Sequence, residues 1–146
     1  MPTVSTVSLS SQPIDRVWQE VLDIASFPSY MDEVREVEIL HQEQDVRRSR
    51  WSILLKGSIL EWEEEERIDT ENRKITFHQI EGDLAYFTGW WHVRQTDRGV
   101  STQMHVEFDI GIPLLADMLN PVAARALEEN AQKILSRIDT RAGSPA

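Results

Sequence analysis

The feature that most constrains the fold is a long helical pattern at residues 121–138. Its apolar residues recur on one face, with charged residues on the other: Val122, Ala123, Ala126, Leu127, Ala131, Ile134, Leu135 and Ile138. Asn120 is a favourable N-cap, and Pro121 is tolerated in a first turn. Such a helix is about 27 Å long, and its apolar face must be buried. We therefore expect the rest of the chain to wrap around it.

The chain before this helix is patterned mostly as strands separated by short turns. Expected strands cover residues 3–10, 34–41, 46–55, 58–68, 74–80, 85–95 and 100–110. Helical spacing covers 14–23, a second short helical piece falls near 27–31, and a separate helical turn is expected at 114–119. This order predicts an α+β fold, a curved seven-stranded antiparallel sheet around the C-terminal helix with two short helices after the first strand. We expect one domain over residues 1–140 and a flexible tail at 141–146.

The charge balance limits the classes of partner. The net charge of −10 on 146 residues argues against nucleic acid and against an anionic membrane surface. With no cysteine, disulfides, a thiolate nucleophile and a cysteine-type zinc site are excluded. No secretion signal or apolar run of membrane-spanning length is present, so the expectation is a cytoplasmic protein. The acidic run at 63–66 is interpreted as a solvated strand end that discourages edge pairing.

Several segments together resemble the START-like (Bet v 1-like, SRPBCC) superfamily, especially its polyketide cyclase/dehydrase and coenzyme Q-binding (Coq10-like) branches. They are Gln12–Trp18, Val21–Ile24, Phe27–Pro28, Val34–Leu40, Phe87–Val93, the strand through Phe108 and the helix after Pro113. The resemblance covers residues 3–138. It implies a helix-grip fold that encloses an apolar cavity. Members bind lipids, polyketides, quinones or plant hormones, some close aromatic rings, and some act as ribosome-associated toxins.

Aromatic and methionine side chains are the candidates for lining such a cavity. For any one of them alone, core packing is the preferred interpretation. Asn130 either is a core amide paired with backbone or faces the cavity, and residues 27–31 either cap the core or line a pocket mouth. The candidate ligand-binding residues are Phe27, Tyr30, Met31, Trp62, Phe77, Phe87, Trp91, Met104, Phe108, Met118, Leu119, Val122, Ala126 and Asn130.

Arg67 is the candidate catalytic residue. The resemblance to aromatase/cyclases implies an inward arginine at this strand position, which could stabilise an enolate oxygen. Strand alternation, however, places Arg67 on the face opposite Trp62, where it would be exposed and paired with glutamates. The tyrosine of those enzymes is replaced by Val34. The four histidines lack metal-ligand spacing, so neither a metal nor a cofactor is expected.

The leading hypothesis is a non-enzymatic protein that binds or carries a hydrophobic small molecule, lipid-, quinone- or polyketide-like. The alternative is a polyketide aromatase/cyclase or dehydratase, which needs little beyond positioning and one polar group. A third hypothesis is an interaction role like that of the ribosome-associated relatives. The sequence leaves the ligand, the pathway and the oligomeric state open.

Overall fold

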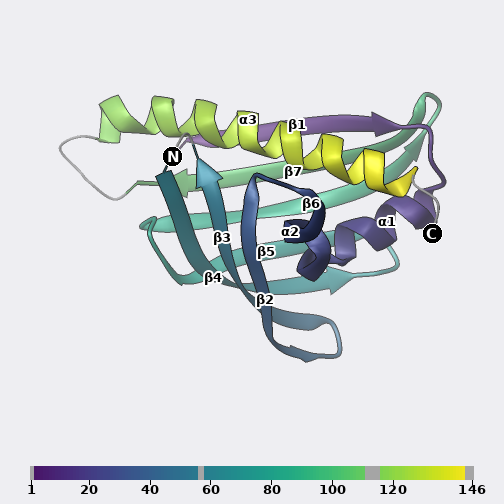
Figure 1. The fold of residues 1–146 in the computed structure, drawn as a ribbon, viewed down its shortest axis with the longest axis horizontal. Coiled ribbons are helices and arrows are strands. Elements are labelled where there is room, and N and C mark those ends of the chain that lie inside the picture. The colour runs from purple at the N-terminus through teal and green to yellow at the C-terminus, as the bar shows by residue number, and fades with distance from the viewer. Residues whose placement is uncertain (1, 56–57, 111–115, 144–146) are drawn as a thin grey trace.

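The computed structural model describes residues 2–55, 58–110 and 116–143, with only the backbone described at 55, 58 and 116–120. The elements follow in the order β1 (Thr3–Ser10), α1 (Ile14–Leu22), the 3-10 turn η1 (Ile24–Ser26), α2 (Phe27–Tyr30), β2 (Val34–Glu43), β3 (Val46–Leu55), β4 (Ser58–Asp69), β5 (Lys74–Gly82), β6 (Tyr86–Thr96), β7 (Gly99–Asp109) and α3 (Ala116–Ala142). Figure 1 shows this arrangement. The α+β prediction is confirmed.

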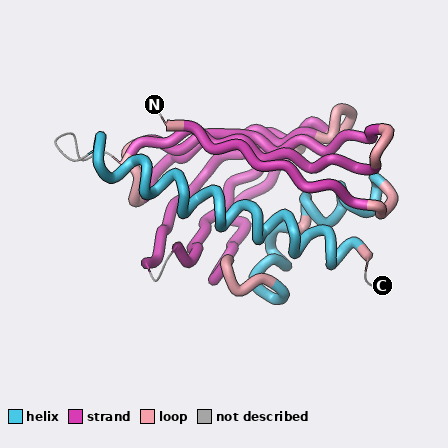
Figure 2. Tube along the Cα trace, turned by 90° about the horizontal axis from the view of Figure 1, so that it is seen from above, coloured by secondary structure: helices cyan, strands magenta, loops and turns pink. Residues whose placement is uncertain are grey.

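The seven strands form one antiparallel sheet in the order β1-β7-β6-β5-β4-β3-β2. Each strand pairs with its neighbour in the chain, except β1, which pairs with β7. The helix α3 runs along the sheet and packs mainly against β1, while α1 and α2 lie near its C-terminal end (Figures 1 and 2). The core fills the space between the sheet and these helices. This is the helix-grip arrangement that the sequence predicts.

The predicted bounds of α3 were wrong at its N-terminus. The helix begins at Ala116, so residues 116–119 belong to it rather than to a separate turn, and Pro121 lies inside it. A proline this near the start removes only one backbone hydrogen bond, which a long packed helix tolerates. The helix also continues past Ile138 to Ala142, which is buried. Of the predicted tail, residues 144–146 lie outside the described part of the chain.

The interpretation of the acidic run was also wrong. Strand β4 lies between β3 and β5 in the sheet and therefore has no free edge. Side chains alternate along it, so Glu64 and Glu66 point inward with Trp62, whereas Arg67 points outward and is exposed. A register irregularity against β5 falls between Glu63 and Glu64, yet the alternation within β4 continues unbroken. Two carboxyl groups thus lie in the core.

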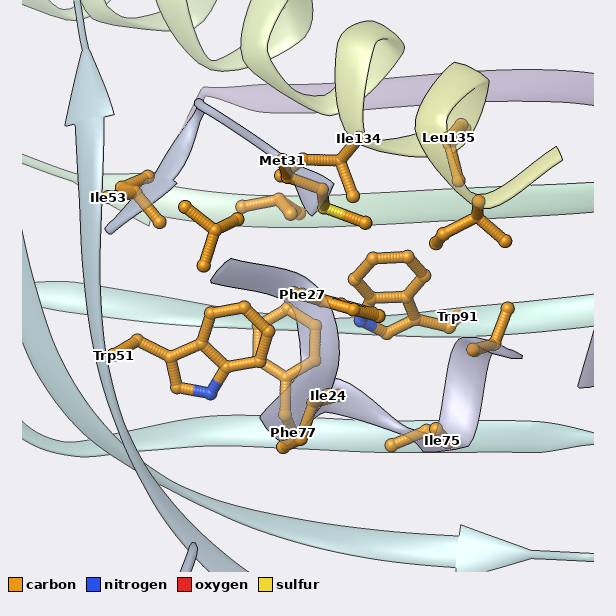
Figure 3. Close-up of a cluster of buried hydrophobic side chains, with 14 of the residues drawn as sticks. Ile24, Phe27, Met31, Trp51, Ile53, Ile75, Phe77, Trp91, Ile134 and Leu135 are labelled. Atoms are coloured by element: carbon orange, nitrogen blue, oxygen red, sulfur yellow. The ribbon is translucent and has the colours of Figure 1, made fainter. Parts of the chain in front are cut away.

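The segment at residues 27–31 caps the core. Phe27 on α2 is fully buried, and its ring lies 5.9 Å from Trp51 and 6.4 Å from Trp91, measured between centroids (Figure 3). Tyr30 packs edge-on against Phe27 and beneath the Arg141 guanidinium. Because these rings fill the space beside α2, the segment closes one end of the interior.

Candidate functional site

A cavity remains between the sheet and the middle of α3. Its enclosed volume is about 40 Å³, and its empty space is about 550 Å³ when the opening to solvent is included. Side chains from β1, β3, β4, β5, β6, β7 and α3 line it, namely Val4, Thr6, Trp51, Ile53, Trp62, Glu64, Phe77, Phe87, Trp91, Met104, Val106, Leu127, Asn130, Ala131 and Ile134.

Six of the candidate ligand-binding residues are among those that line this cavity: Trp62, Phe77, Phe87, Trp91, Met104 and Asn130. The indoles of Trp51 and Trp62 stack in parallel with centroids 5.7 Å apart, and Phe87 packs edge-on against Trp62 at 5.0 Å. Trp51 and Trp62 face each other on the adjacent strands β3 and β4, whereas Phe87 lies on β6, on the other side of β5. The inward faces of β3 to β6 therefore form an aromatic wall.

The other candidate residues lie elsewhere. Phe27, Met31 and Phe108 are fully buried in packed core, and Ala126 is buried in α3 without lining the cavity. Tyr30 packs near the end of α3, and burial raises the pKa of its hydroxyl above the ordinary value. Val122 is 67% exposed, because this turn of α3 presents it to solvent rather than to the sheet. The side chains of Met118 and Leu119 lie outside the described residues.

A buried ion pair lies beside the cavity on β3 and β4. Arg47 donates from Nε to Glu66 Oε1 at 2.7 Å and from Nη2 to Glu66 Oε2 at 3.2 Å, and both side chains are less than 5% exposed. Its third nitrogen, Nη1, donates to the Leu22 carbonyl at 2.8 Å. Ser49 adds a hydroxyl donor to Glu66 Oε1 at 3.1 Å and accepts the Trp51 indole N–H at 2.8 Å. Glu66 is therefore a fully bonded carboxylate.

Glu64 is the second buried carboxyl group, and it lines the cavity. Its Oε1 accepts a 2.7 Å hydrogen bond from the Trp62 indole N–H, and its carboxyl group also hydrogen-bonds to that of Glu66. Burial, reinforced by the negative charge of Glu66, raises the pKa of Glu64 well above its ordinary value. Burial therefore favours the neutral acid form of Glu64, which stands in the aromatic wall.

Two further polar side chains line the cavity. Asn130 on α3 donates from Nδ2 to the Leu54 carbonyl at 3.0 Å, which ties the helix to the end of β3. It thus both pairs with backbone and faces the cavity, so the two interpretations of its role are compatible. Thr6 on β1 is 5% exposed, and its hydroxyl has no hydrogen-bond partner among the described residues. An unsatisfied buried hydroxyl costs about 1–3 kcal/mol.

Sequence reasoning missed Glu64, Glu66 and Arg47 as residues of the interior. Four successive glutamates make the inner and outer faces of β4 look alike, so polarity gave no signal of burial. The available signal was the position of Trp62 in the strand. If Trp62 points inward, strand alternation places Glu64 and Glu66, two and four residues later, on the same inward face. Arg67, the catalytic candidate, is exposed on the outer face and does not belong to the cavity lining.

The described residues contain no cluster of three or more histidine, aspartate or glutamate side chains that could hold a metal ion. Within the same residues, no helix has the length and apolarity needed to cross a membrane.

Comparison with known families gives one family match, over residues 10–135, to the family described as polyketide cyclase/dehydrase and lipid transport. Among curated proteins, the chain is 29% identical over 91 residues to one named "Putative polyketide cyclase" from Streptomyces halstedii, spanning 60% of this chain and 84% of that protein.

Comparison with solved structures gives the same fold. TTHA0849 from Thermus thermophilus superposes with a TM-score of 0.89 at 26% identity, over 97% of both chains. The Zhui aromatase/cyclase from Streptomyces sp. R1128 gives 0.83 at 19% identity, over 97% of this chain and 93% of that one. A START superfamily protein from Mycobacterium smegmatis gives 0.78 at 17% identity, over 94% and 97%.

Proposed function

We propose, on the premise that this chain belongs to the polyketide cyclase/dehydrase and lipid transport family, that its cavity binds a compact aromatic small molecule. The observation that carries the proposal is the cavity lining, which combines five aromatic side chains with only three polar ones. Small-molecule sites in proteins generally have this composition. Flat ligands suit a wall of stacked and edge-on rings.

The size of the cavity favours a compact ligand over a long-chain lipid. The enclosed volume of about 40 Å³ cannot hold an acyl chain. A bicyclic aromatic compound still has to displace some side chains, and the half-buried Met104 is suited to this because its unbranched chain adopts many shapes. The opening to solvent supplies the remaining volume.

Binding of the neutral, fluorescent bicyclic compound 1-naphthylamine tests the proposal. Ala131 lines the cavity, so Ala131→Leu adds three carbon atoms to it without harming helix propensity. We expect this variant to weaken probe binding at least tenfold. The matched control is Val122→Leu, which changes an exposed position of the same helix and should bind like the wild type. Absence of probe binding by the wild type, or equal binding by Ala131→Leu, would refute the proposal.

A second candidate function is proton-transfer catalysis on an enolisable ketone, the chemistry that a cyclase or dehydratase requires. The specific observation in its favour is the adjacent pair of a neutral acid, Glu64, and an ionised carboxylate, Glu66, beside the cavity. A neutral acid can protonate a developing enolate and a carboxylate can accept a proton, so this second function requires Glu64 to release its proton to the substrate instead of holding it toward Glu66. Exchange of the α-protons of 2-tetralone in heavy water, followed by NMR, measures this activity. Catalysed exchange that Glu64→Gln abolishes would support it, and no acceleration by the wild type would exclude it for this ketone.

A further inference from the structure

The polar groups of the cavity divide into satisfied and unsatisfied ones. Asn130 is bonded to the Leu54 carbonyl, which accounts for its presence without a ligand. Thr6 is more than nine-tenths buried, faces the cavity and has no partner among the described residues. Since buried hydroxyls are nearly always paired, the orphan hydroxyl points to a polar atom that an occupant brings.

The bonds around Glu64 determine which of its atoms an occupant can use. Arg47 directs all three of its nitrogens to Glu66 and to a backbone carbonyl, so its hydrogen bonds neutralise Glu66, and its charge offsets only part of the rise in the pKa of Glu64. Two carboxyl groups and one guanidinium in a buried cluster require one additional proton for neutrality. Burial raises the pKa of Glu64, so Glu64 is the group that takes this proton, and its carboxyl group hydrogen-bonds to that of Glu66.

The oxygen of Glu64 that is identified as an acceptor is Oε1. It accepts the Trp62 indole N–H at 2.7 Å, and a carbonyl oxygen has a second lone pair. Because the acid proton is held by a charge-assisted bond to Glu66, a ligand cannot easily take it. Glu64 therefore presents a hydrogen-bond acceptor to the cavity.

We propose that Glu64 selects the ligand by this acceptor, so that the cavity takes aromatic compounds with a hydroxyl group, phenols or enols, in preference to equally sized compounds without a donor. This inference rests on the proposed function and specifies its ligand class. The Thr6 hydroxyl, which also lines the cavity, provides a partner for a second oxygen of such a compound.

The test compares 2-naphthol with 2-fluoronaphthalene, which has nearly the same size and shape but no donor. Dissociation constants come from NMR titration of the tryptophan indole N–H signals, and the Trp62 signal reports directly on the group that shares Oε1. We expect the wild type to bind 2-naphthol about tenfold more tightly, the effect of one net hydrogen bond. 2-Naphthaldehyde, which can only accept, should bind no better than 2-fluoronaphthalene.

Two substitutions locate the preference. Glu64→Gln retains an acceptor oxygen for Trp62 and an N–H donor toward Glu66, so the tenfold preference should persist. Glu64→Met removes both, so the preference should vanish while 2-fluoronaphthalene still binds. Equal binding of the two compounds by the wild type, tighter binding of the aldehyde, or a preference that survives in a folded Glu64→Met would overturn the inference. Failure of all three compounds to bind would instead refute the proposed function.

Discussion

Replacing Arg47 with methionine should strongly destabilise the protein, and more so at pH 7 than at pH 5. The substitution preserves much of the apolar stem of the side chain but removes the partner of Glu66, which is 2% exposed. An unpaired carboxylate cannot stay charged in such a site without a large penalty. In the folded variant Glu66 therefore stays neutral by binding a proton. In the unfolded chain the same glutamate has released that proton at any pH above its ordinary pKa.

The cost follows from this proton. Protonating a glutamate of ordinary pKa near 4.3 costs about 1.36 kcal/mol per pH unit, hence about 3.7 kcal/mol at pH 7 and about 1 kcal/mol at pH 5. Loss of the bond from Arg47 Nη1 to the Leu22 carbonyl adds about 1 kcal/mol. The expected decrease in the free energy of unfolding is therefore about 4–5 kcal/mol at pH 7 and about 2 kcal/mol at pH 5.

Urea denaturation followed by circular dichroism at both pH values measures this decrease. Arg48→Met is the matched control, since it alters the adjacent arginine on the outer face and should cost less than about 1 kcal/mol. Adding Glu66→Gln to Arg47→Met should recover most of the loss at pH 7, because a neutral amide needs no proton. A loss below about 1 kcal/mol for Arg47→Met at pH 7, or an equal loss at both pH values, would show that the pair is not buried as described.

Three further predictions follow from the cavity and its walls. The raised pKa of Glu64 lets the folded state hold a proton that the unfolded chain releases, so the contribution of Glu64 to stability is complete below about pH 4.3 and declines as pH rises. In urea denaturation, the free energy of unfolding of Glu64→Gln should therefore increase relative to that of the wild type from pH 5 to pH 8. Parallel pH profiles of the two proteins would contradict this. Thr6→Val removes an unpaired hydroxyl at nearly constant shape, so it should leave the unfolding free energy unchanged or raise it by up to about 1 kcal/mol, and thermal denaturation showing a clear loss would mean that the hydroxyl has a partner. Gly89→Ala places a Cβ against the backbone carbonyl of His105, which cannot move aside, so it should cost about 1–3 kcal/mol, whereas Gly143→Ala meets only a flexible side chain and serves as the near-neutral control in the same assay.

The fold was predictable because two periodicities dominate the chain. The alternation in β7 and the helical stripe of α3 identify which faces are buried, and Leu127, Ile134 and Leu135 are buried as that stripe requires. The start of α3 was not predictable in the same way. Asn120 and Pro121 form a good N-terminal signal, yet the packed helix continues through them to Ala116, since a tertiary context can outweigh one missing backbone bond.

The candidate site was only partly predictable. Large aromatic side chains such as Trp91 point to the interior from sequence alone, but whether a given ring fills the core or borders empty space depends on side chains from several strands at once. Phe27 and Phe108 fill space, while Phe87 borders it. The buried acids were missed for a different reason. A glutamate is expected to be exposed unless a cation pairs with it, and the pairing of Arg47 with Glu66 cannot be predicted until the register of β3 and β4 is known.

The direct opposition of Arg47 and Glu66 in the β3–β4 hairpin also bears on the order of folding. Adjacent strands joined by a short turn pair early, because little chain entropy is lost in closing the loop between them. This placement allows the two charges to meet while the hairpin is still surrounded by water and to enter the interior as a neutral pair. If the arginine were on a distant element, Glu66 would be an unpaired carboxylate while the chain collapses. Placing both groups on one hairpin avoids this energetically costly state.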